Sequence, residues 1–366
     1  MLKERTVAVV VPAYNEESQI GKVIESMPEF VDLILIVNDK SKDNTSDVVQ
    51  NYIKNDTKAL NPQLSIEKWT HSDNPYDMAT NVYYEIRQKE DEKFLPNKVI
   101  SSPRSRVILI DHLENGGVGA AIASGYKLAR DYNIDCTAVM AGDGQMDPSE
   151  LESICMPVIE QKVDYCKGNR LSHQAAKAFI PKTRYIGNSV LSILTKIASG
   201  YWRISDTQTG YTSISLRALE KVNLWDIYKS YGMPNDLLVK LNIESLKITE
   251  IPIKPVYNVG EQSKMKVILV VPRVSLLLLK SFFKRLWTKY FKRSFHPLFL
   301  LYFLSFILFL LSIPFGIMVF KNALIKGPII NSNILVIYIF FLIMSFQSFF
   351  FAMWMDMQDN ERLYIS

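Results

Sequence analysis

The segment from Val139 to Pro148 carries the residues best suited to chemistry. An apolar run, 136–140, ends in two carboxylates, Asp143 and Asp147, with glycines and a glutamine beside them. Open α/β sheets bind ligands at the carboxyl ends of their strands. Carboxylates there suit Mg²⁺ or Mn²⁺, hard cations that also take substrate phosphates as ligands. The alternative is a tight turn that Asp147 and Pro148 close before a helix.

Residues 1–265 form the domain that must position these carboxylates. From residue 6 onward, short β-branched runs alternate with amphipathic helical stretches, which predicts βα units around a mainly parallel sheet. The polar stretch at about 55–106 is predicted to be an insertion, with one helix over Met78–Lys93. The strands expected to be buried on both faces are Thr6–Val11, Leu33–Val37, Val107–Ile110 and Cys136–Met140.

The C-terminal part, 295–366, is of a different kind. Its two apolar stretches, 298–320 and 329–355, each reach the about 20 residues needed to cross a bilayer, so we expect a transmembrane hairpin. The preceding segment, 266–294, is amphipathic and basic, and predicts a helix lying in the membrane interface rather than a linker helix packed on protein. Its cations are Lys280, Lys284, Arg285, Lys289, Lys292 and Arg293. The positive-inside rule then places both termini and the α/β domain in the cytoplasm.

The composition excludes several classes of protein. The chain is 48% hydrophobic and 22% charged, with a net charge of +5, so it is neither disordered nor acidic. The positive charge gathers beside the apolar stretches, which favours a membrane surface as partner and not nucleic acid. The three cysteines lack metal-type spacing and fit a reducing environment, and the scattered histidines suggest no metal site. The N-terminus does not look like a signal peptide, and homo-oligomerisation stays open.

Five motifs in order resemble those of family 2 glycosyltransferases with the GT-A fold. They are Pro12-Ala-Tyr-Asn-Glu-Glu17, Asn38-Asp-Lys-Ser-Lys-Asp43, Asn115-Gly-Gly-Val-Gly119, the Asp143 segment and Asp206-Thr-Gln-Thr-Gly-Tyr211. The two-span tail resembles in particular the polyprenyl-phosphate (dolichol-phosphate-type) sugar synthases. The resemblance implies a Rossmann-like GT-A domain, a nucleotide-sugar donor (UDP-, GDP- or similar), Mg²⁺ or Mn²⁺, and a polyprenyl phosphate acceptor.

The resemblance also assigns a set of residues to the donor nucleotide. These are Pro12, Ala13, Tyr14, Glu16, Asp39, Gly117 and Lys264. Asp39 matches the acid that pairs with the nucleobase edge. The family usually has Asp-Asp there and this chain has Asn38-Asp39, but Asn38 can still accept a hydrogen bond. At Gly117 bare backbone can approach a ligand closely, or the start of a helix can pack tightly on the sheet. Lys264 matches an element that closes over the donor.

The residues matched to the reaction itself are Asp143, Gln145, Arg170, Arg184, Asp206 and Asp236. Asp143 matches the second acid of the family's Asp-x-Asp signature, whose first acid is Ala141 here. The metal would therefore rest on Asp143, helped by Asp147 or water. Arg170 and Arg184 would bind phosphate, because a guanidinium donates to two oxygens at once. Asp206 matches the acceptor-side motif.

The expected role of Asp236 depends on the kind of acceptor. A hydroxyl acceptor needs a general base, whereas a phosphate monoester, with a second pKa of about 6, is already ionised at neutral pH. For a phosphate acceptor Asp236 would be structural, for example the N-cap of a helix over Leu237–Asn242. We predict an inverting, metal-dependent transferase that makes a polyprenyl-phosphate-linked sugar at the cytoplasmic face. The alternatives are transfer to a hydroxyl of a lipid-linked glycan and, further off, a non-catalytic nucleotide-sugar or lipid-binding protein.

Overall fold

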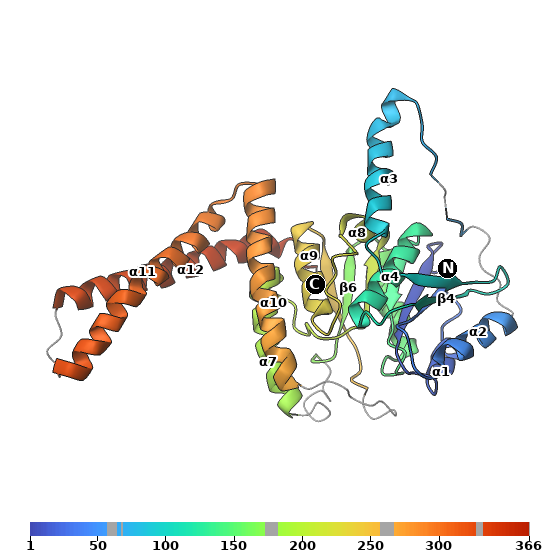
Figure 1. Cartoon of the computed structure of the whole chain (residues 1–366), viewed down its shortest axis with the longest axis horizontal. Coiled ribbons are helices and arrows are strands. Elements are labelled where there is room, and N and C mark those ends of the chain that lie inside the picture. Colours follow the sequence, from blue (N-terminus) through green and yellow to red (C-terminus); the bar gives the residue numbers. More distant parts are fainter. Residues whose placement is uncertain (57–63, 67–68, 173–181, 257–266, 327–331, 366) are drawn as a thin grey trace.

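An eight-stranded sheet in the order β3-β4-β2-β1-β5-β7-β6-β8 forms the centre of the computed structural model (Figure 1). The strands are β1 Val7–Ala13, β2 Leu33–Asn38, β3 Asn97–Ile100, β4 Val107–His112, β5 Cys136–Val139, β6 Tyr165–Asn169, β7 Thr212–Ser215 and β8 Ile248–Pro252. The structure describes residues 1–56, 64–66, 69–172, 182–256, 267–326 and 332–365, without the side chains of 182–188, 267–270 and 325–326. The predicted strands are confirmed as β1, β2, β4 and β5.

Helices cover both faces of this sheet. The helices are α1 Ile20–Glu25, α2 Thr45–Asn55, α3 Met78–Asp91, α4 Val118–Asp131, α5 Leu151–Ile159, α7 Lys182–Ser199, α8 Leu216–Lys221, α9 Met233–Ile243, α10 Val267–Trp287, α11 Pro297–Lys326 and α12 Ser332–Glu361. Alternate residues of β1 face opposite layers: Val7, Val9 and Val11 pack with α1, α2 and α5, whereas Ala8 and Val10 pack with α4. Burial on both sides explains why the inner strands are apolar throughout.

All the motif-bearing loops leave the same edge of the sheet. β1 pairs in parallel with β2 and β5, and β2 with β4, so their carboxyl ends lie together. β7 runs antiparallel, and its first residue, Thr212, pairs with Val139 at the end of β5. β6 and β8 are parallel to each other and end at this edge too. The loops after β1, β2, β4, β5 and β6 and the loop before β7 are therefore neighbours.

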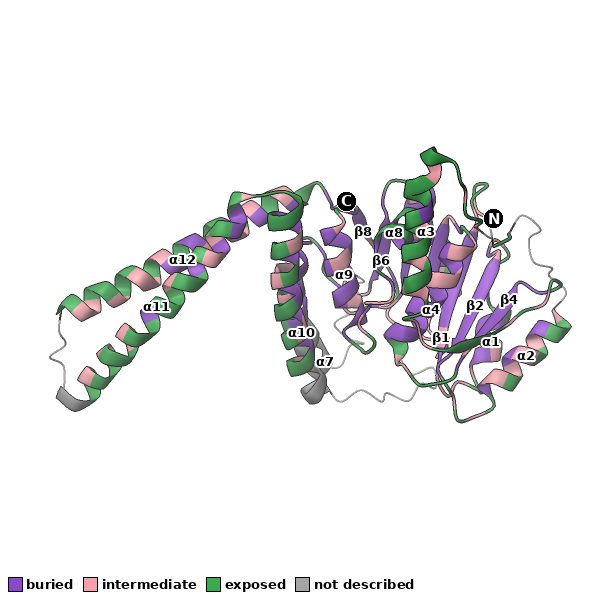
Figure 2. Ribbon diagram, turned by 45° about the horizontal axis from the view of Figure 1, so that its top comes forward, coloured by how far each residue is buried: buried purple, intermediate pink, exposed green. Residues whose placement is uncertain are grey.

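The insertion contains the predicted helix, here α3, followed by the antiparallel edge strand β3. α3 stands away from the sheet in both overall views, and most of its side chains are exposed (Figures 1 and 2). Trp69 stacks on Tyr84 of α3 with ring centroids 5.3 Å apart, which ties the described part of the insertion to the helix.

α11 and α12 form the predicted hairpin, which projects from the domain as two adjacent helices (Figure 1). Each is long and apolar enough to cross a membrane, and most of its apolar residues are exposed (Figure 2). A helix that exposes such side chains along its length fits a lipid environment better than water.

α10 lies between the hairpin and the domain and is amphipathic, as predicted. Its inner face packs on α7 and α9 through Leu278 and Leu286, whereas Leu276, Leu279 and Trp287 are exposed on the outer face. In Figure 1 this helix runs across the base of the hairpin rather than along it. That orientation suits a helix lying in the plane of a membrane interface.

Two of the six cations assigned to the membrane surface are not on it. Arg285 and Lys289 are buried, and each has partners on α12. Arg285 forms a two-pronged ion pair with Asp356, at 2.8 Å on each side, and donates to Ala198 O at the end of α7. Lys289 donates to Asn360 at 2.6 Å. Arg285, in α10, and Lys289, in the π-helical turn Thr288–Arg293 that follows it, both face the protein, where acidic and amide partners replace phospholipid.

The last residues of the chain return to the sheet. Ile248 N at the start of β8 donates to Leu363 O at 2.8 Å, and Ile365 N donates to Ile248 O at 2.9 Å. Leu363 is buried in the same core as α4 and α9. The tail after α12 therefore covers the β8 edge, which would otherwise present unpaired backbone groups.

We expect the Arg285–Asp356 pair to hold the hairpin to the domain, because both side chains are fully buried. Asp356→Asn should leave a buried cation poorly paired and lower the free energy of unfolding in detergent by about 3–5 kcal/mol. Lys284→Met, which removes the exposed pair with Asp226, should cost less than about 1 kcal/mol. Equal losses in chemical denaturation of the two variants would contradict this assignment.

Candidate active site

The loops after β1 and β2 hold each other in place at the carboxyl edge of the sheet. Asp39 N donates to Ala13 O at 2.9 Å, and Lys42 N donates to the Asn15 side chain at 2.8 Å. Glu16 N donates to Thr45 Oγ1 at 3.0 Å. The residues predicted to bind the donor nucleotide here are thus brought together. Among them Ala13 and Asp39 are buried, whereas Pro12, Tyr14 and Glu16 are half-buried.

The Asp39 carboxylate is surrounded by hydrogen-bond donors. His112 Nδ1 lies 2.9 Å from Oδ1, Gly116 N donates to the same oxygen at 2.8 Å, and Gly117 N donates to Oδ2 at 2.7 Å. Burial alone would raise the pKa of Asp39, but these hydrogen bonds outweigh it and hold the pKa below its usual value. Asp39 is therefore ionised at neutral pH and can only accept hydrogen bonds.

Gly117 has a φ of +83°, and a Cβ there would lie 2.5 Å from Lys229 O. At Gly119 a Cβ would lie 2.0 Å from Tyr228 O. These glycines allow the start of α4 to pack against the 228–229 loop, where Gly119 N donates to Lys229 O at 2.9 Å while Gly117 N donates to Asp39. The local geometry thus favours tight packing, which was the alternative to direct ligand approach at Gly117.

Asp143 lies in a turn just beyond β5, where it is half-buried. Its Oδ1 accepts a hydrogen bond from Gln145 N at 3.0 Å, and Gly144 between them has a φ of +74°. The Asp143 carboxylate and the Gln145 side chain therefore both come from this one short turn. Gly142 N donates to Pro12 O at 3.3 Å, which brings the Asp143 turn beside the β1 loop.

Asp147 has a different set of partners. Its Oδ1 accepts from Ser149 N at 2.9 Å and caps a short 3₁₀ turn, Pro148–Glu150, and its Oδ2 lies 3.6 Å from the Lys254 ammonium. The Ser149 hydrogen bonds, opposed in part by burial and aided by Lys254, lower the pKa of Asp147. The capped turn considered as an alternative is therefore present. Over the described ranges, no group of three or more His, Cys, Asp or Glu side chains is placed to hold a metal ion.

The donor chemistry at Asp143 nevertheless fits a divalent cation with few protein ligands. Mg²⁺ commonly binds through one or two carboxylates, completing its shell with water and substrate phosphates. Asp143 supplies one such hard oxygen ligand at the edge where the phosphates would lie. Asp147, occupied by Ser149 and Lys254, is the weaker candidate.

Arg170, which is half-buried, and the buried Asp206 form an ion pair in the neighbouring loops. Arg170 Nε donates to Oδ2 at 2.8 Å and Nη2 to Oδ1 at 3.1 Å. Gln208 N and Thr209 N also donate to Asp206, each at 3.2 Å. Burial opposes ionisation of Asp206, but the Arg170 charge and hydrogen bonds prevail and lower the pKa of that carboxyl. The Arg170 guanidinium thus uses one edge to bind Asp206, and this contact holds the acceptor-side motif in place.

Sequence reasoning missed two buried charges behind this pair, Lys167 and Glu250. Lys167 Nζ donates to Thr209 O, and Glu250 accepts from the backbone N–H groups of Ser205 and Asp206, both at 2.9 Å. Burial lowers the pKa of Lys167 to about 8, although Asp206 and Glu250 act in the other direction. The only signal was a polar residue inside each of two short strands, which is common enough to pass unnoticed.

Asp236 lies in the first turn of α9 and is buried. Its Oδ2 accepts from Tyr228 N at 2.9 Å and from Lys240 Nζ at 2.6 Å. The expectation that it caps a helix over Leu237–Asn242 is wrong in detail, because α9 begins at Met233, where Pro234 provides a favourable first-turn residue. Asp236 instead ties this helix to the 228–229 loop.

Two further predicted residues cannot be placed against these groups. Lys264 lies outside the described residues, and Arg184 belongs to α7 but its side chain is not among those described.

A small apolar pocket of about 140 Å³ lies beside the acceptor-side motif. Its walls come from α4, β5, the 208–210 turn and the start of α9, and include Val118, Ile122, Val139, Gly210, Tyr231 and Pro234. Gln208 lines the same pocket and donates to Asn235 Oδ1 at 3.1 Å. The loop before α9 also approaches α10, because a Cβ on Gly232 would lie 2.8 Å from Leu277 Cδ2.

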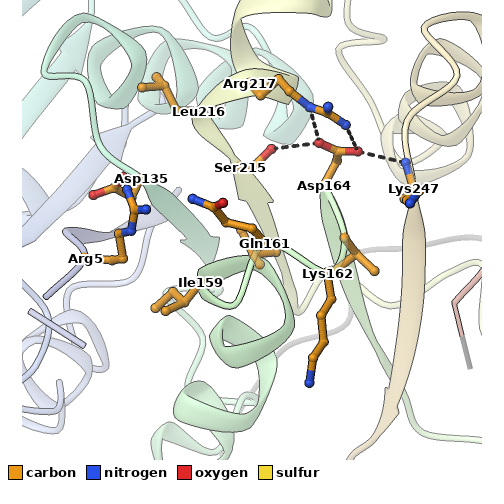
Figure 3. A pocket seen from close by; sticks show the side chains of 12 residues that line it. Arg5, Asp135, Ile159, Gln161, Lys162, Asp164, Ser215, Leu216, Arg217 and Lys247 are labelled. Carbon is orange, nitrogen blue, oxygen red and sulfur yellow. Dashed lines mark hydrogen bonds and ion pairs between the residues drawn. The ribbon is translucent and has the colours of Figure 1, made fainter. Parts of the chain in front are cut away.

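A larger cavity, of about 400 Å³, lies at the opposite edge of the sheet, near the amino ends of β5 and β6 (Figure 3). Its charged side chains are largely paired with one another. Asp164 binds Arg217 at 2.8 and 2.7 Å, and Arg5 binds Asp135 at 2.9 Å. None of the predicted site residues lines this cavity.

Residues 8–64 match the glycosyl transferase family 2 model. A UDP-N-acetylglucosamine–dolichyl-phosphate N-acetylglucosaminyltransferase of Methanococcus voltae is 26% identical over 258 residues, covering 70% of this chain and 88% of that protein. A dolichyl-phosphate β-glucosyltransferase of Trichomonas vaginalis is 24% identical over 303 residues, covering 77% and 75%.

The chain is thus similar to the glycosyl transferase family 2 model over its first two strands, and to dolichyl-phosphate sugar transferases over most of its length. Among solved structures, it resembles glucosyl-3-phosphoglycerate synthase from Mycobacterium tuberculosis in complex with Mn²⁺, UDP and phosphoglyceric acid. That match has a TM-score of 0.46 at 14% identity and covers 77% of this chain and 78% of the other. We transfer no residue role from so distant a structure.

The pKa of Lys167 leads to a test by pH. As pH rises through about 8, Lys167 loses its charge, Asp206 and Glu250 lose a counter-charge, and sugar transfer should decline because the 206–210 turn is less well held. Unfolding does not explain such a decline. The unfolded chain keeps this proton to about pH 10.5, so the Lys167 contribution to the free energy of unfolding rises over that range.

Transfer rates between pH 7 and 9.5 would show this alkaline limb in the native protein. Lys167→Met should have a lower rate without the limb. Persistence of the same limb in Lys167→Met would assign it to another group.

Proposed function

We propose that this protein is a membrane-anchored, inverting glycosyltransferase that transfers a sugar from a nucleotide-sugar to a polyprenyl phosphate. A phosphate oxygen of the lipid attacks the anomeric carbon as the bond from that carbon to the nucleoside diphosphate breaks. The observation that carries the choice of acceptor is the environment of Asp236. Its carboxylate is buried and bound to Tyr228 N and Lys240, which suits an acceptor that needs no general base.

The donor half of the proposed site is formed by the loops after β1 and β2. Asp39, ionised and fixed by three donors, lies where it can accept from the pairing edge of a nucleobase, beside Pro12, Ala13 and Tyr14. The Asp143 turn, one strand away, places its carboxylate beside this loop. A nucleotide bound along the edge would thus extend from Asp39 to Asp143.

Asp143 would hold Mg²⁺ or Mn²⁺, which when bound neutralises charge developing on the leaving diphosphate as a Lewis acid. Gln145, from the same turn, is placed to donate to sugar or phosphate oxygens. Arg170 contributes positive charge at the neighbouring strand end while its pairing with Asp206 fixes its direction. Such a charge is effective because it is already oriented before the reaction.

The acceptor half of the site favours a lipid over a glycan. The pocket beside Gln208 and Gly210 has mostly apolar walls, and sugar hydroxyls there would lack hydrogen-bond partners. The loop at its rim approaches Leu277 of α10. An isoprenoid held at the membrane surface could therefore reach the strand ends by way of α10.

The hairpin and the exposed face of α10 support membrane anchoring. Lys280 and Lys292 are exposed near Leu279 and Trp287, as expected for a helix whose charged groups meet lipid phosphates and whose apolar groups enter the interface. With the positive segment on the cytoplasmic side, the domain and both termini would be cytoplasmic.

Asp143→Ala should lower kcat/KM for transfer by about 100-fold or more, because it removes the carboxylate proposed to hold the metal at the diphosphate. Asp147→Ala should cost much less, since that side chain caps a turn. Glu160→Gln, at an exposed position near the opposite edge, serves as the unaffected control. Mass spectrometry of lipid-linked sugar formed with Mg²⁺ or Mn²⁺ provides the rate. Undiminished transfer by Asp143→Ala would remove the centre of the proposal.

The acceptor is tested with purified protein in detergent, a panel of nucleotide-sugars, and either a short polyprenyl phosphate or the matching polyprenol. We expect product with the phosphate alone, and Asp236→Asn should retain transfer within about tenfold because Asn can still accept from Tyr228 N. Product from an alcohol, together with loss of turnover in a folded Asp236→Asn that still binds donor, would instead establish a hydroxyl acceptor. Donor binding without turnover on any acceptor would point to a binding protein.

A further inference from the structure

A chain of three buried side chains runs from the nucleotide edge into the core. His112 Nδ1 lies 2.9 Å from Asp39 Oδ1, and His112 Nε2 lies 2.9 Å from Ser124 Oγ in α4. The exposed fractions of Asp39, His112 and Ser124 are 3%, 2% and 4%. Sequence reasoning treated His112 as one of four scattered histidines, so nothing assigned it a role.

The direction of the first hydrogen bond follows from the chemistry of its partners. The ionised Asp39 carboxylate can only accept, so His112 Nδ1 must carry a hydrogen. With a neutral ring, Nε2 then accepts from the Ser124 hydroxyl. Both ring nitrogens are used, and α4 and the end of β4 enclose the ring, so the imidazole is held in one orientation.

The described donors around Asp39 occupy all but one of the lone-pair sites of its carboxylate. Oδ1 accepts from His112 and Gly116, and Oδ2 accepts from Gly117. A carboxylate offers about four lone-pair sites, so the described residues occupy all but one, and that one is on Oδ2. A ligand that meets it has to supply an N–H or O–H group.

We propose that His112, supported by Ser124, is a positioning residue that holds Asp39 as a fixed acceptor for the donor nucleobase. The consequence is a restriction on the base. Uracil, thymine and guanine have a ring N–H at the pairing edge, which the remaining site on Oδ2 can accept. Cytosine and adenine have a ring nitrogen lone pair at that place, which would face the carboxylate unfavourably. This inference rests on the proposed function, because it takes Asp39 to face the nucleobase.

The arrangement is not a nucleophilic triad. Ser124 lies in the middle of α4, is 4% exposed, and its hydroxyl is hydrogen-bonded to His112 Nε2, so it is not presented to a ligand as a nucleophile. The simpler alternative is that His112 only fills space between β4 and α4. A positioning role and a packing role for His112 predict different results for substitutions whose side chain replaces only one of the two ring nitrogens.

Asparagine and glutamine separate these possibilities. In His112→Asn the amide nitrogen can take the place of Nδ1 and keep the hydrogen bond to Asp39. In His112→Gln the amide reaches the place of Nε2, near Ser124, and leaves Oδ1 with one donor fewer. A hydrogen bond to a charged group is worth enough to change affinity by about tenfold or more.

The experiment measures binding of UDP, GDP, CDP and ADP to the full-length protein in detergent by calorimetry, and KM for donor and acceptor separately. We expect native protein to bind UDP or GDP at least tenfold more tightly than CDP and ADP. His112→Gln should raise the donor Kd and KM about tenfold or more and leave the acceptor KM unchanged. His112→Asn should stay within about threefold of the native protein.

Should His112→Gln fail to fold, Ser124→Ala provides the second variant, with an expected rise of about threefold in donor KM because the ring is held at one end only. Equal effects of Asn and Gln, matched by equal losses of thermal stability, would reduce His112 to core packing and overturn the inference. Tight binding of CDP or ADP by the native protein would overturn it as well. If the native protein binds none of the four nucleotides, the proposed function itself fails, which is a distinct result.

Discussion

The site depends on one requirement: a carboxylate buried at the end of a strand must gather enough donors to stay ionised. Asp39 obtains them from His112 and from the backbone of Gly116 and Gly117, which bends the loop before α4 around it. Asp206 obtains them from Arg170 and from its own turn. Glu250 accepts from the N–H groups of Ser205 and Asp206, which oppose in part the rise in its pKa caused by burial. The loop conformations at this edge are thus a consequence of charge burial.

The same physical principle joins the domain to the hairpin. Arg285 and Asp356 are both inaccessible to solvent, and the amide of Asn360 links Asp356 to Lys289 through a continuous set of hydrogen bonds. Tyr290 donates to Asp356 from the turn between α10 and α11. Together with the backbone hydrogen bonds of the C-terminal tail to Ile248 of β8, these contacts fix how the hairpin leaves the domain. The proposed function, with a soluble donor and a lipid acceptor, would require such a connection, because it would keep the site at a fixed distance from the bilayer.

Much of the architecture was predictable because it depends on local pattern. The continuous apolar runs in β1, β2, β4 and β5 could only be strands covered on both faces, and the hairpin follows from length and hydropathy. The positions of Asp39 and Asp143 at one edge follow from parallel strand order, whereas Asp206 reaches this edge because it precedes the antiparallel strand β7. The roles of Lys167, Glu250 and His112 did not follow. A polar residue inside a strand shows that it needs a partner but not which partner, and these partners, apart from Ser124, lie between 39 and 83 positions away in the chain.

The sequence by itself determined the class of fold, the helical tail and the order of the motifs, since these come from periodicity, length and spacing along the chain. Only the tertiary structure decided which charges face the ligand and which serve the fold. Arg285 and Lys289, predicted at the membrane surface, are buried in the protein. Asp147 caps a turn, and Asp236 lies in the first turn of a helix. Asp39 is enclosed with His112. The physical reason is that the ionisation and direction of a side chain depend on burial and on donors from distant segments, which no local pattern contains.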